Sequence, residues 1–196
     1  DEIDSGSIIF DGKKLSTLKE KELSDIRRKE MGFVFQQPTL IKNLNVLDNI
    51  ILPSMRDNKK NSTKIIKRAQ TLMQETGISE LETRNITEVS GGQLQRVGIC
   101  RALMNEPKII FGDEPTGALN SKSSKEIMQL LLTINNGGTT IVLVTHDANV
   151  AAFASRVVFM GDGNIIDEIN FSKLEDIKKL DNRVIQVTKK MQEIGI

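Results

Sequence analysis

Short apolar runs without helical spacing are distributed along the chain and predict β-strands. Met31–Phe35 is one such run, and Ile109–Phe111 and Ile141–Val144 are compact enough to predict buried strands. Val157–Met160 and Ile165–Ile166 flank a Gly-Asp-Gly turn, so together they predict a β-hairpin. Strands are therefore expected in both halves of the chain.

Helical spacing begins at Asn45, whose side chain can cap a short helix together with Asp48. Residues 94–104 predict a further helix. Near the start of the chain, residues 6–15 predict a short strand that ends in an Asp-Gly turn. Gly77 can end the helix that precedes it. The apolar residues on one face of that helix are Ile65, Ile66, Ala69, Leu72 and Met73.

Two more helices are predicted in the second half of the chain. Ser123 and Glu126 form a capping box, and Gly137-Gly138 can end the helix that they begin. Ser172 and Glu175 predict the start of a final amphipathic helix. Its apolar residues are Leu174, Ile177, Val184, Met191 and Ile194.

Strands that alternate with helices predict an α/β fold with a parallel sheet. We expect a single domain over residues 1–196, with a sheet core formed by residues 1–40 and 106–170. A helical insert is expected at residues 41–105, where the alternation is interrupted, and a C-terminal helix at residues 171–196.

Composition narrows the class of protein. A length of 196 residues suits one domain, and a net charge of +1 gives no indication of nucleic-acid binding. Cys100 is the only cysteine, so it cannot form an intrachain disulfide, which fits a reducing cytosol. No apolar run reaches the roughly 20 residues that span a bilayer, and the first four residues do not begin a signal peptide.

Carboxylates follow the strand predicted at residues 109–111. Asp113 and Glu114 stand at its carboxyl end, where α/β sheets bind ligands; there Asp can hold Mg²⁺ and Glu can activate water. The alternative is that both acids only stabilise a helix N-terminus. His146, the only histidine, follows the strand at residues 141–144, in a position for ligand contact or for a structural hydrogen bond.

Two polar segments add candidate ligands. Ser90-Gly91-Gly92-Gln93 precedes a predicted helix, so its hydroxyl and backbone amides can approach an anion, although it can equally be a plain N-cap. Gln36 ends the first strand run with an amide that can reach a metal or a water, although Gln36-Gln37-Pro38 can equally be only a turn.

The order and spacing of these segments resemble the ATP-binding domain of ABC transporters over essentially the whole chain. Gln36 matches the family's glutamine loop, and Ser90–Gln93 matches the signature motif, with Val89 where Leu is usual. Asp113 and Glu114 match the Walker B aspartate and the catalytic glutamate, and His146 matches the switch histidine.

The stretch from Gly112 to Asn120 resembles the lipoprotein-release, macrolide-export and antimicrobial-peptide (bacitracin and lantibiotic) resistance branch. Pro115–Leu119 resembles the stretch leading to the D-loop, where Asn120 replaces the usual Asp and puts contacts across the dimer in doubt. This resemblance implies a P-loop NTPase (RecA-like) fold with a helical subdomain and an antiparallel β element.

The resemblance also implies function. ATP would bind between two copies, with Ser90, Gly91, Gly92 and Gln93 of one facing the γ-phosphate held by the other. Gln36 and Asp113 would attend Mg²⁺, Glu114 would polarise water and His146 would contact the γ-phosphate. A separate transmembrane permease would hold this ATPase at the cytoplasmic face of the plasma membrane, without nucleic acid. Apolar residues between Pro38 and Arg56 would either contact the permease or pack the insert itself; they are Leu40, Ile41, Leu44 and Leu47.

One family motif has no match. The sequence contains no Gly-x-x-x-x-Gly-Lys-Ser/Thr, and the window from Gly6 to Lys14 has the wrong glycine spacing. We therefore expect an N-terminally incomplete ATPase domain that is inactive alone. The alternatives are a non-enzymatic remnant of the fold and the head of a DNA-maintenance ATPase; the compact interval between Gln36 and Ser90, without sustained heptads, argues against the latter.

Overall fold

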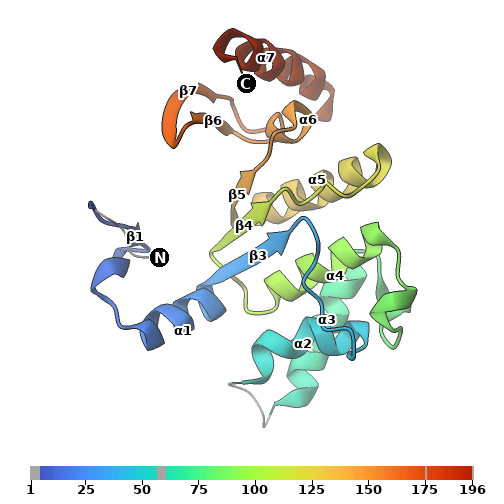
Figure 1. The fold of residues 1–196 in the computed structure, drawn as a ribbon. Helices are drawn as coiled ribbons and strands as arrows, with labels where there is room; N and C mark the ends of the chain where they lie inside the picture. Colours follow the sequence, from blue (N-terminus) through green and yellow to red (C-terminus); the bar gives the residue numbers. More distant parts are fainter. Residues whose placement is uncertain (1–4, 57–60, 175, 196) are drawn as a thin grey trace. The chain divides into compact units, whose positions relative to one another are not determined.

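The chain forms two compact units in the computed structural model, and each unit is described by itself (Figure 1). Unit 1 comprises Asp1–Val34 and Pro38–Phe111, and unit 2 comprises Phe35–Gln37 and Gly112–Ile196. The division into subdomains expected from the sequence stays a prediction. The residues that the structure describes are 5–56, 61–174 and 176–195.

The central sheet has the strand order β3-β4-β5 and is parallel. β3 (Met31–Phe35) and β4 (Ile109–Asp113) occupy the positions predicted for two of the strands. Alternate residues of these strands point into the core, so Val34 is 2% exposed and Ile110 is fully buried. Apolar side chains at alternate positions thus hold the strands whose carboxyl ends position the candidate site.

β5 (Thr140–Val144) is a strand as predicted, but the prediction that it is buried is wrong. Val142 is 43% exposed and Val144 is 64% exposed. β5 is last in the sheet order, so within the described chain it has one neighbouring strand, and it packs against α5 (Ser121–Asn136). An apolar run thus identified the strand but not its burial, which depends on the elements that cover its two faces.

A hairpin in unit 1 precedes the sheet. β1 (Ile9–Phe10) and β2 (Lys13–Lys14) are antiparallel, and Asp11 and Gly12 form the turn with positive φ angles of 49° and 75°. The predicted strand with its Asp-Gly turn is confirmed, and a second short strand follows the turn. Gly12 suits this conformation because it has no Cβ to clash in the left-handed region.

An ion-pair network fastens this hairpin within unit 1. Lys108 Nζ lies 2.6 Å from Asp11 Oδ2 and 2.7 Å from Glu30 Oε2, at the end of α1 (Glu20–Glu30). The hydrogen bonds to both carboxylates raise the pKa of Lys108, and the bond from Lys108 lowers the pKa of Asp11. No helix was predicted at α1 from the sequence, because its many charged residues leave only Ile26 buried.

Three helices of unit 1 pack against one another: α2 (Val46–Met55), α3 (Ser62–Glu75) and α4 (Gly91–Leu103). Asn45 caps α2, since its Oδ1 accepts a 2.7 Å hydrogen bond from the Asp48 N–H, as predicted. Fully buried side chains in this part of unit 1 include Val46, Ile50, Ile78, Val97 and Ile99. Short 3-10 helices of the chain are Leu15–Thr17, Ser79–Leu81, Ile86–Glu88 and Ile177–Lys179.

The C-terminal part of unit 2 is a hairpin packed on a helix (Figure 1). β6 (Arg156–Gly161) and β7 (Asn164–Asn170) are antiparallel, which confirms the predicted hairpin. Val157 and Phe159 of β6 pack with Val187 of α7 (Leu180–Ile194). The short helix α6 (Ala148–Ala151) also contacts α7.

Two predicted helix starts in unit 2 were wrong. α5 begins at Ser121 rather than at Ser123, because Asn120 supplies the capping oxygen earlier. α7 begins at Leu180 rather than at Ser172, because Asp176 caps a short 3-10 helix first. Glu175, part of the predicted start of α7, lies outside the described residues.

Arg183 fastens α7 to neighbouring backbone. Its guanidinium donates to the carbonyl oxygens of Ala154, at 3.2 Å, and Ser172, and it lies 4.8 Å from the ring centroid of Phe171. The residue is 5% exposed, and burial lowers its pKa. Backbone acceptors and the aromatic face together compensate the cost of burying this charge.

Candidate active site in unit 2

The chain turns sharply at the carboxyl end of β4. Glu114 has a φ of 43°, in the left-handed region that residues other than glycine rarely occupy. Its carbonyl accepts a 2.9 Å hydrogen bond from the Gly117 N–H, which closes a turn through Pro115 and Thr116. Such backbone costs on the order of 1–3 kcal/mol and is concentrated at functional sites. The turn projects the Glu114 carboxylate from the end of the strand.

The ends of β4 and β5 bring Glu114 and His146 together. The Glu114 N–H donates a 2.9 Å hydrogen bond to the carbonyl of Val144, the last residue of β5. Two residues later, His146 Nδ1 lies 2.6 Å from Glu114 Oε1. The histidine side chain is 79% exposed and the glutamate side chain is 29% exposed. A solvent-accessible carboxylate held by an imidazole can accept a proton from a water molecule.

The segment after His146 is held by its own polar residues. The Asp147 N–H donates to Thr145 Oγ1 at 3.1 Å, and Asp147 Oδ1 accepts from the Asn149 N–H at 2.8 Å. Asp147 therefore caps α6. This local network fixes the backbone on both sides of the imidazole.

Gln36 lies at the same turn, beside Gly117. A Cβ built on Gly117 would be 2.7 Å from Gln36 Nε2 and 3.2 Å from Glu114 Oε2. The ends of both side chains therefore lie against one backbone position of the turn. From the sequence, Gly117 was predicted only as part of the stretch leading to the D-loop and was missed as a site residue. Its signal in the sequence was no more than a glycine three residues after Glu114 and three residues before Asn120.

Asp113 and Gln36 provide oxygen atoms suited to a magnesium ion. Asp113 is the exposed last residue of β4, next to Glu114 in sequence. The described residues contain no group of three or more His, Cys, Asp or Glu able to enclose a metal ion. Mg²⁺ is commonly held by one or two carboxylates together with substrate phosphates rather than by a full protein cage. One carboxylate and one carboxamide therefore fit Mg²⁺ that is held in part by phosphate groups.

The signature residues lie in unit 1, at the start of α4. Ser90 is the N-cap, and its N–H and Oγ donate to Gln93 Oε1 at 3.1 and 2.9 Å. Gly91 and Gly92 are inside the helix, so α4 begins three residues before the predicted helix at residues 94–104. The first amides of a helix have no partner within the helix, and the positive end of its dipole favours anions.

Asn120 belongs to unit 2 and caps α5, since its Oδ1 accepts a 2.9 Å hydrogen bond from the Ser123 N–H. Gln36, Asp113, Glu114 and His146 lie in the same unit, whereas Ser90–Gln93 lie in unit 1. The structure therefore brings Gln36, Glu114 and His146 together, and it places Asp113 directly beside them along the chain.

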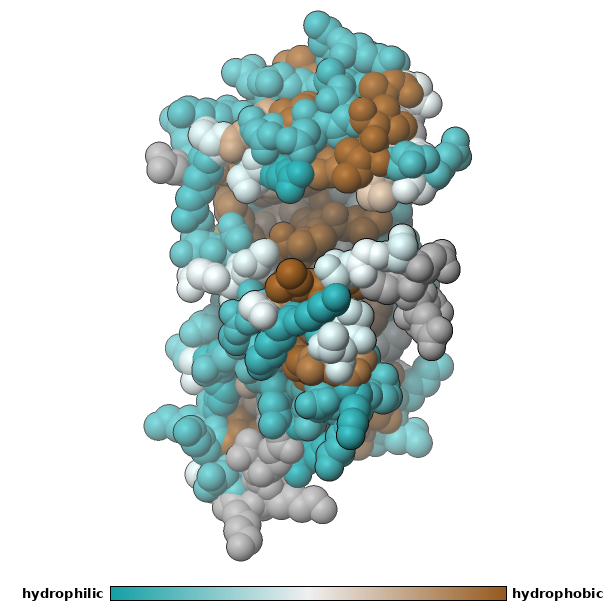
Figure 2. All heavy atoms as spheres, turned by 90° about the vertical axis from the view of Figure 1, so that its left-hand side faces the viewer, coloured by the Kyte–Doolittle hydropathy of each residue, from teal (hydrophilic) through white to brown (hydrophobic). Residues whose placement is uncertain are grey.

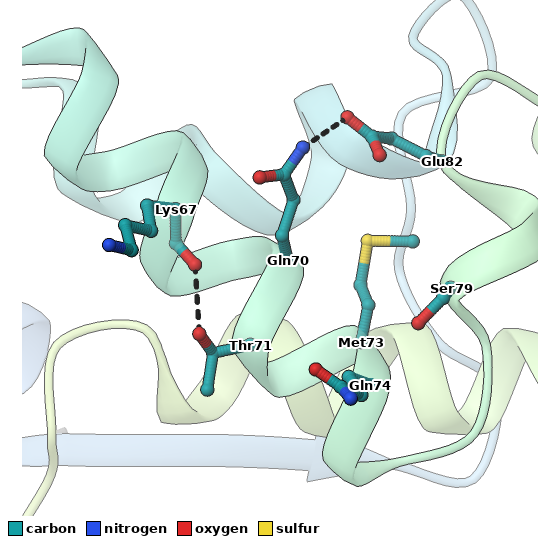
Figure 3. Close-up of a pocket in the computed structure, with 7 residues that line it drawn as sticks. All are labelled: Lys67, Gln70, Thr71, Met73, Gln74, Ser79 and Glu82. Carbon is teal, nitrogen blue, oxygen red and sulfur yellow. Dashed lines mark hydrogen bonds between the residues drawn. The ribbon is translucent and has the colours of Figure 1, made fainter.

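A shallow pocket of about 310 Å³ lies on α3 in unit 1 and contains none of the predicted site residues (Figure 3). Gln70 Nε2 donates to Glu82 Oε1 at 3.0 Å, and Thr71 Oγ1 donates to the Lys67 carbonyl at 3.0 Å. The other lining residues are Met73, Gln74 and Ser79. Three of its polar side chains, those of Gln70, Thr71 and Glu82, already bond to protein, so the turn after β4, which holds predicted site residues, remains the candidate active site.

Comparison with protein families identifies the chain. The family model described as ABC transporter matches residues 1–117. The chain belongs to the ABC transporter family, which confirms the resemblance in the sequence. The fold is that of ABC ATPase cassettes: the dimeric structure of MJ0796, a bacterial ABC transporter cassette, has a TM-score of 0.79 and 40% identity, covering 88% of this chain and 76% of that one.

Curated relatives lie in the branch predicted from the sequence. The lipoprotein-releasing system ATP-binding protein LolD of Aquifex aeolicus is 43% identical over 84% of this chain and 73% of its own length. The bacitracin export ATP-binding protein BceA of Halalkalibacterium halodurans is 42% identical over 87% of this chain and 67% of its own length. The macrolide export protein MacB of Pasteurella multocida is 43% identical over 85% of this chain, which spans a quarter of that relative's length.

Proposed function

We propose that this chain is the hydrolytic part of an ATPase that powers an ABC exporter. The observation that supports this most directly is the 2.6 Å contact between Glu114 Oε1 and His146 Nδ1, with Gln36 at the same turn. A structure of the similar cassette MJ0796 is described as a post-hydrolysis state bound to ADP and Pi, with a TM-score of 0.78 and 39% identity. ATP is therefore the proposed substrate.

In this proposal Glu114 is the general base. Its carboxylate accepts a proton from water as the water attacks the γ-phosphate, a role worth typically 10²- to 10⁴-fold in rate. His146 holds Oε1 of that carboxylate and presents its exposed ring to the γ-phosphate. The positive φ of Glu114 and its hydrogen bond to Val144 keep the carboxylate at the end of the sheet.

Asp113 and Gln36 are the proposed holders of Mg²⁺. Bound Mg²⁺ would neutralise charge that develops on the β- and γ-phosphates. The carboxylate of Asp113 supplies a charged oxygen, and the carboxamide of Gln36 supplies a neutral one. A neutral ligand on an exposed side chain can leave or approach the metal at a smaller electrostatic cost than a carboxylate.

The second half of the nucleotide site is proposed to come from a second copy. Ser90 and the amides of Gly91 and Gly92 would face the γ-phosphate bound to the other subunit, with Gln93 holding Ser90 in place. The start of α4, a helix of 13 residues, provides the positive end of a helix dipole for this contact. Asn120 would approach the same dimer interface.

The membrane partner is proposed to be a separate permease. No helix in the described part of the chain is long and apolar enough to cross a membrane. The names of the relatives refer to lipoprotein release and to macrolide and bacitracin export. We assign this chain to export of, or resistance to, molecules of these classes, at the cytoplasmic face of the plasma membrane and without nucleic acid.

The test is Glu114→Gln in the complete gene product. Turnover of ATP should fall at least about a hundredfold, because an amide cannot accept the proton. ATP affinity should stay within about twofold, and ATP should convert the variant to a dimer on size exclusion. Glu80→Gln is the matched control, since Glu80 is an exposed glutamate in unit 1. Turnover by Glu114→Gln at the wild-type rate would remove Glu114 as the base.

A further inference from the structure

We propose that Gly117 is a positioning residue that sets where the Gln36 carboxamide lies beside Glu114. The inference rests on the proposed ATPase function and adds to it a residue whose contribution is the space it leaves. Gln36 Nε2 comes within 2.7 Å of the position that a Cβ at residue 117 would take. Atoms at that distance overlap, so the observed carboxamide position exists only with glycine there.

The backbone of Gly117 does not itself require glycine. Glycines such as Gly77 and Gly138 have positive φ angles of 70° and 106°, whereas Gly117 is not among the positive-φ residues. An alanine can adopt the Gly117 conformation without strain. The constraint at this position is therefore steric, and it comes from two side chains of the site, Gln36 and Glu114.

These two side chains differ in their freedom to move. Glu114 is held by the imidazole of His146 at 2.6 Å, and its backbone is held by the hydrogen bonds to Val144 and from Gly117. Gln36 reaches Gly117 with the end of a long, exposed side chain. A methyl group at residue 117 will therefore displace the carboxamide of Gln36 and leave the base nearly in place.

The consequence for the proposed reaction is specific. Gln36 is a proposed Mg²⁺ ligand, whereas Glu114 acts on water, so Gly117→Ala should weaken the response to Mg²⁺ more than the chemical step. A general packing defect would weaken the response to Mg²⁺ and slow the chemical step together. The ratio of the two effects thus distinguishes a positioning role from a structural one.

The first experiment observes Gln36 directly, in the nucleotide-free gene product labelled with ¹⁵N. The side-chain amide signal of Gln36 is assigned by its loss in Gln36→Ala. Gly117→Ala should shift this signal, whereas Ala118→Ser, at the exposed neighbouring residue, should leave it unchanged. An unchanged Gln36 signal in Gly117→Ala would overturn the proposal.

The second experiment is a double-mutant cycle on the Mg²⁺ concentration for half-maximal ATP turnover. Gly117→Ala should raise this concentration about tenfold, since misplacing a group by about 1 Å can cost up to a hundredfold. In the Gln36→Ala background the same change should add nothing, because the displaced group is gone. A full additional effect in that background contradicts the proposal.

Stability measurements cover the case in which Gly117→Ala folds poorly. Any loss of melting temperature should be restored by adding Gln36→Ala, because the clash is with that side chain; a loss that persists unchanged overturns the proposal. Absence of ATP turnover in the unsubstituted gene product would contradict the proposed function. The nuclear magnetic resonance result would still decide the role of Gly117.

Discussion

The side-chain oxygen of Asn120 accepts a hydrogen bond from the backbone N–H of Ser123 and thereby caps α5. Asn120 follows the turn that bears Glu114 and lies three residues after Gly117, and α5 begins at the next residue, Ser121. Asn and Asp are about equally good N-caps, which explains why an amide is tolerated where the family usually has Asp. The departure noted in the sequence therefore leaves the local structure intact.

Asn120→Ala should lower the free energy of unfolding by about 1 kcal/mol, because the first turn of α5 loses its acceptor. Urea denaturation followed by circular dichroism measures this loss. Asn120→Asp is the control, and its free energy of unfolding should lie within about 0.5 kcal/mol of that of wild type. Equal stability of the alanine variant would show that solvent replaces the cap.

His146→Ala should reduce kcat of the complete gene product about a hundredfold while ATP affinity changes little. The imidazole holds the Glu114 carboxylate at 2.6 Å, so its loss leaves the base without its orienting partner. Steady-state turnover and equilibrium nucleotide binding separate the two effects. Asn149→Ala, at an exposed residue three positions later, should retain most of the activity. An unchanged kcat for His146→Ala would argue that Glu114 is oriented by its turn alone.

Cys100 should make the protein sensitive to alkali. Burial raises the pKa of Cys100 to about 12 from 9.0, despite a 3.1 Å hydrogen bond with Thr76. The folded state thus keeps its proton at pH values where the unfolded chain has lost it. The contribution of the protonated Cys100 thiol to the free energy of unfolding is complete below pH 9.0. It is lost as the pH rises toward 12, at about 1.4 kcal/mol per pH unit.

Urea denaturation of wild type and Cys100→Ala at pH 8 and pH 10.5 measures this effect. The stability of wild type relative to the variant should decrease by about 2 kcal/mol over this range. Lysines titrate in both proteins and cancel in the difference, and the chain contains no tyrosine. A constant difference between the two proteins would mean that the thiol ionises normally in the folded state.

Ile41→Glu should weaken co-purification with the permease and spare folding and ATP binding. Ile41 is 45% exposed, while its N–H and carbonyl are held by Asn49 at 2.7 and 3.1 Å, so a charge there faces solvent on a fixed backbone. Val46→Glu is the contrasting variant and should unfold the protein, because Val46 is fully buried. Undiminished co-purification of folded Ile41→Glu would exclude this contact.

The sequence predicted those parts of the fold that depend on neighbouring residues. Met31–Phe35 is a strand, Asn45 caps α2 and Gly77 has the left-handed conformation that ends α3, all as expected from local patterns. The exposure of Val142 and Val144 could not be read from an apolar run, because it depends on what covers the sheet. Figure 2 shows hydrophobic surface, in brown, among hydrophilic side chains on the face it views.

The candidate site was predictable by residue type but not by contact. Gln36, Asp113, Glu114 and His146 were identified from their positions after apolar runs and from the family resemblance. The space at Gly117 was not, because no sequence pattern reports the distance between side chains that are far apart in the chain. The positive φ of Glu114 could not be predicted either, because glutamate has no preference for that backbone region.

The contacts of Arg183 make the attachment of α7 insensitive to much of the sequence around it. Its guanidinium donates to main-chain carbonyls, including those of Ala154 and Ser172, so these hydrogen bonds do not depend on which side chains stand at those positions. Homologues can therefore vary them and still dock their last helix in the same register. The sequence should therefore vary more among homologues in these segments than at position 183. Lysine cannot replace Arg183, because its single ammonium group cannot reach the same set of acceptors.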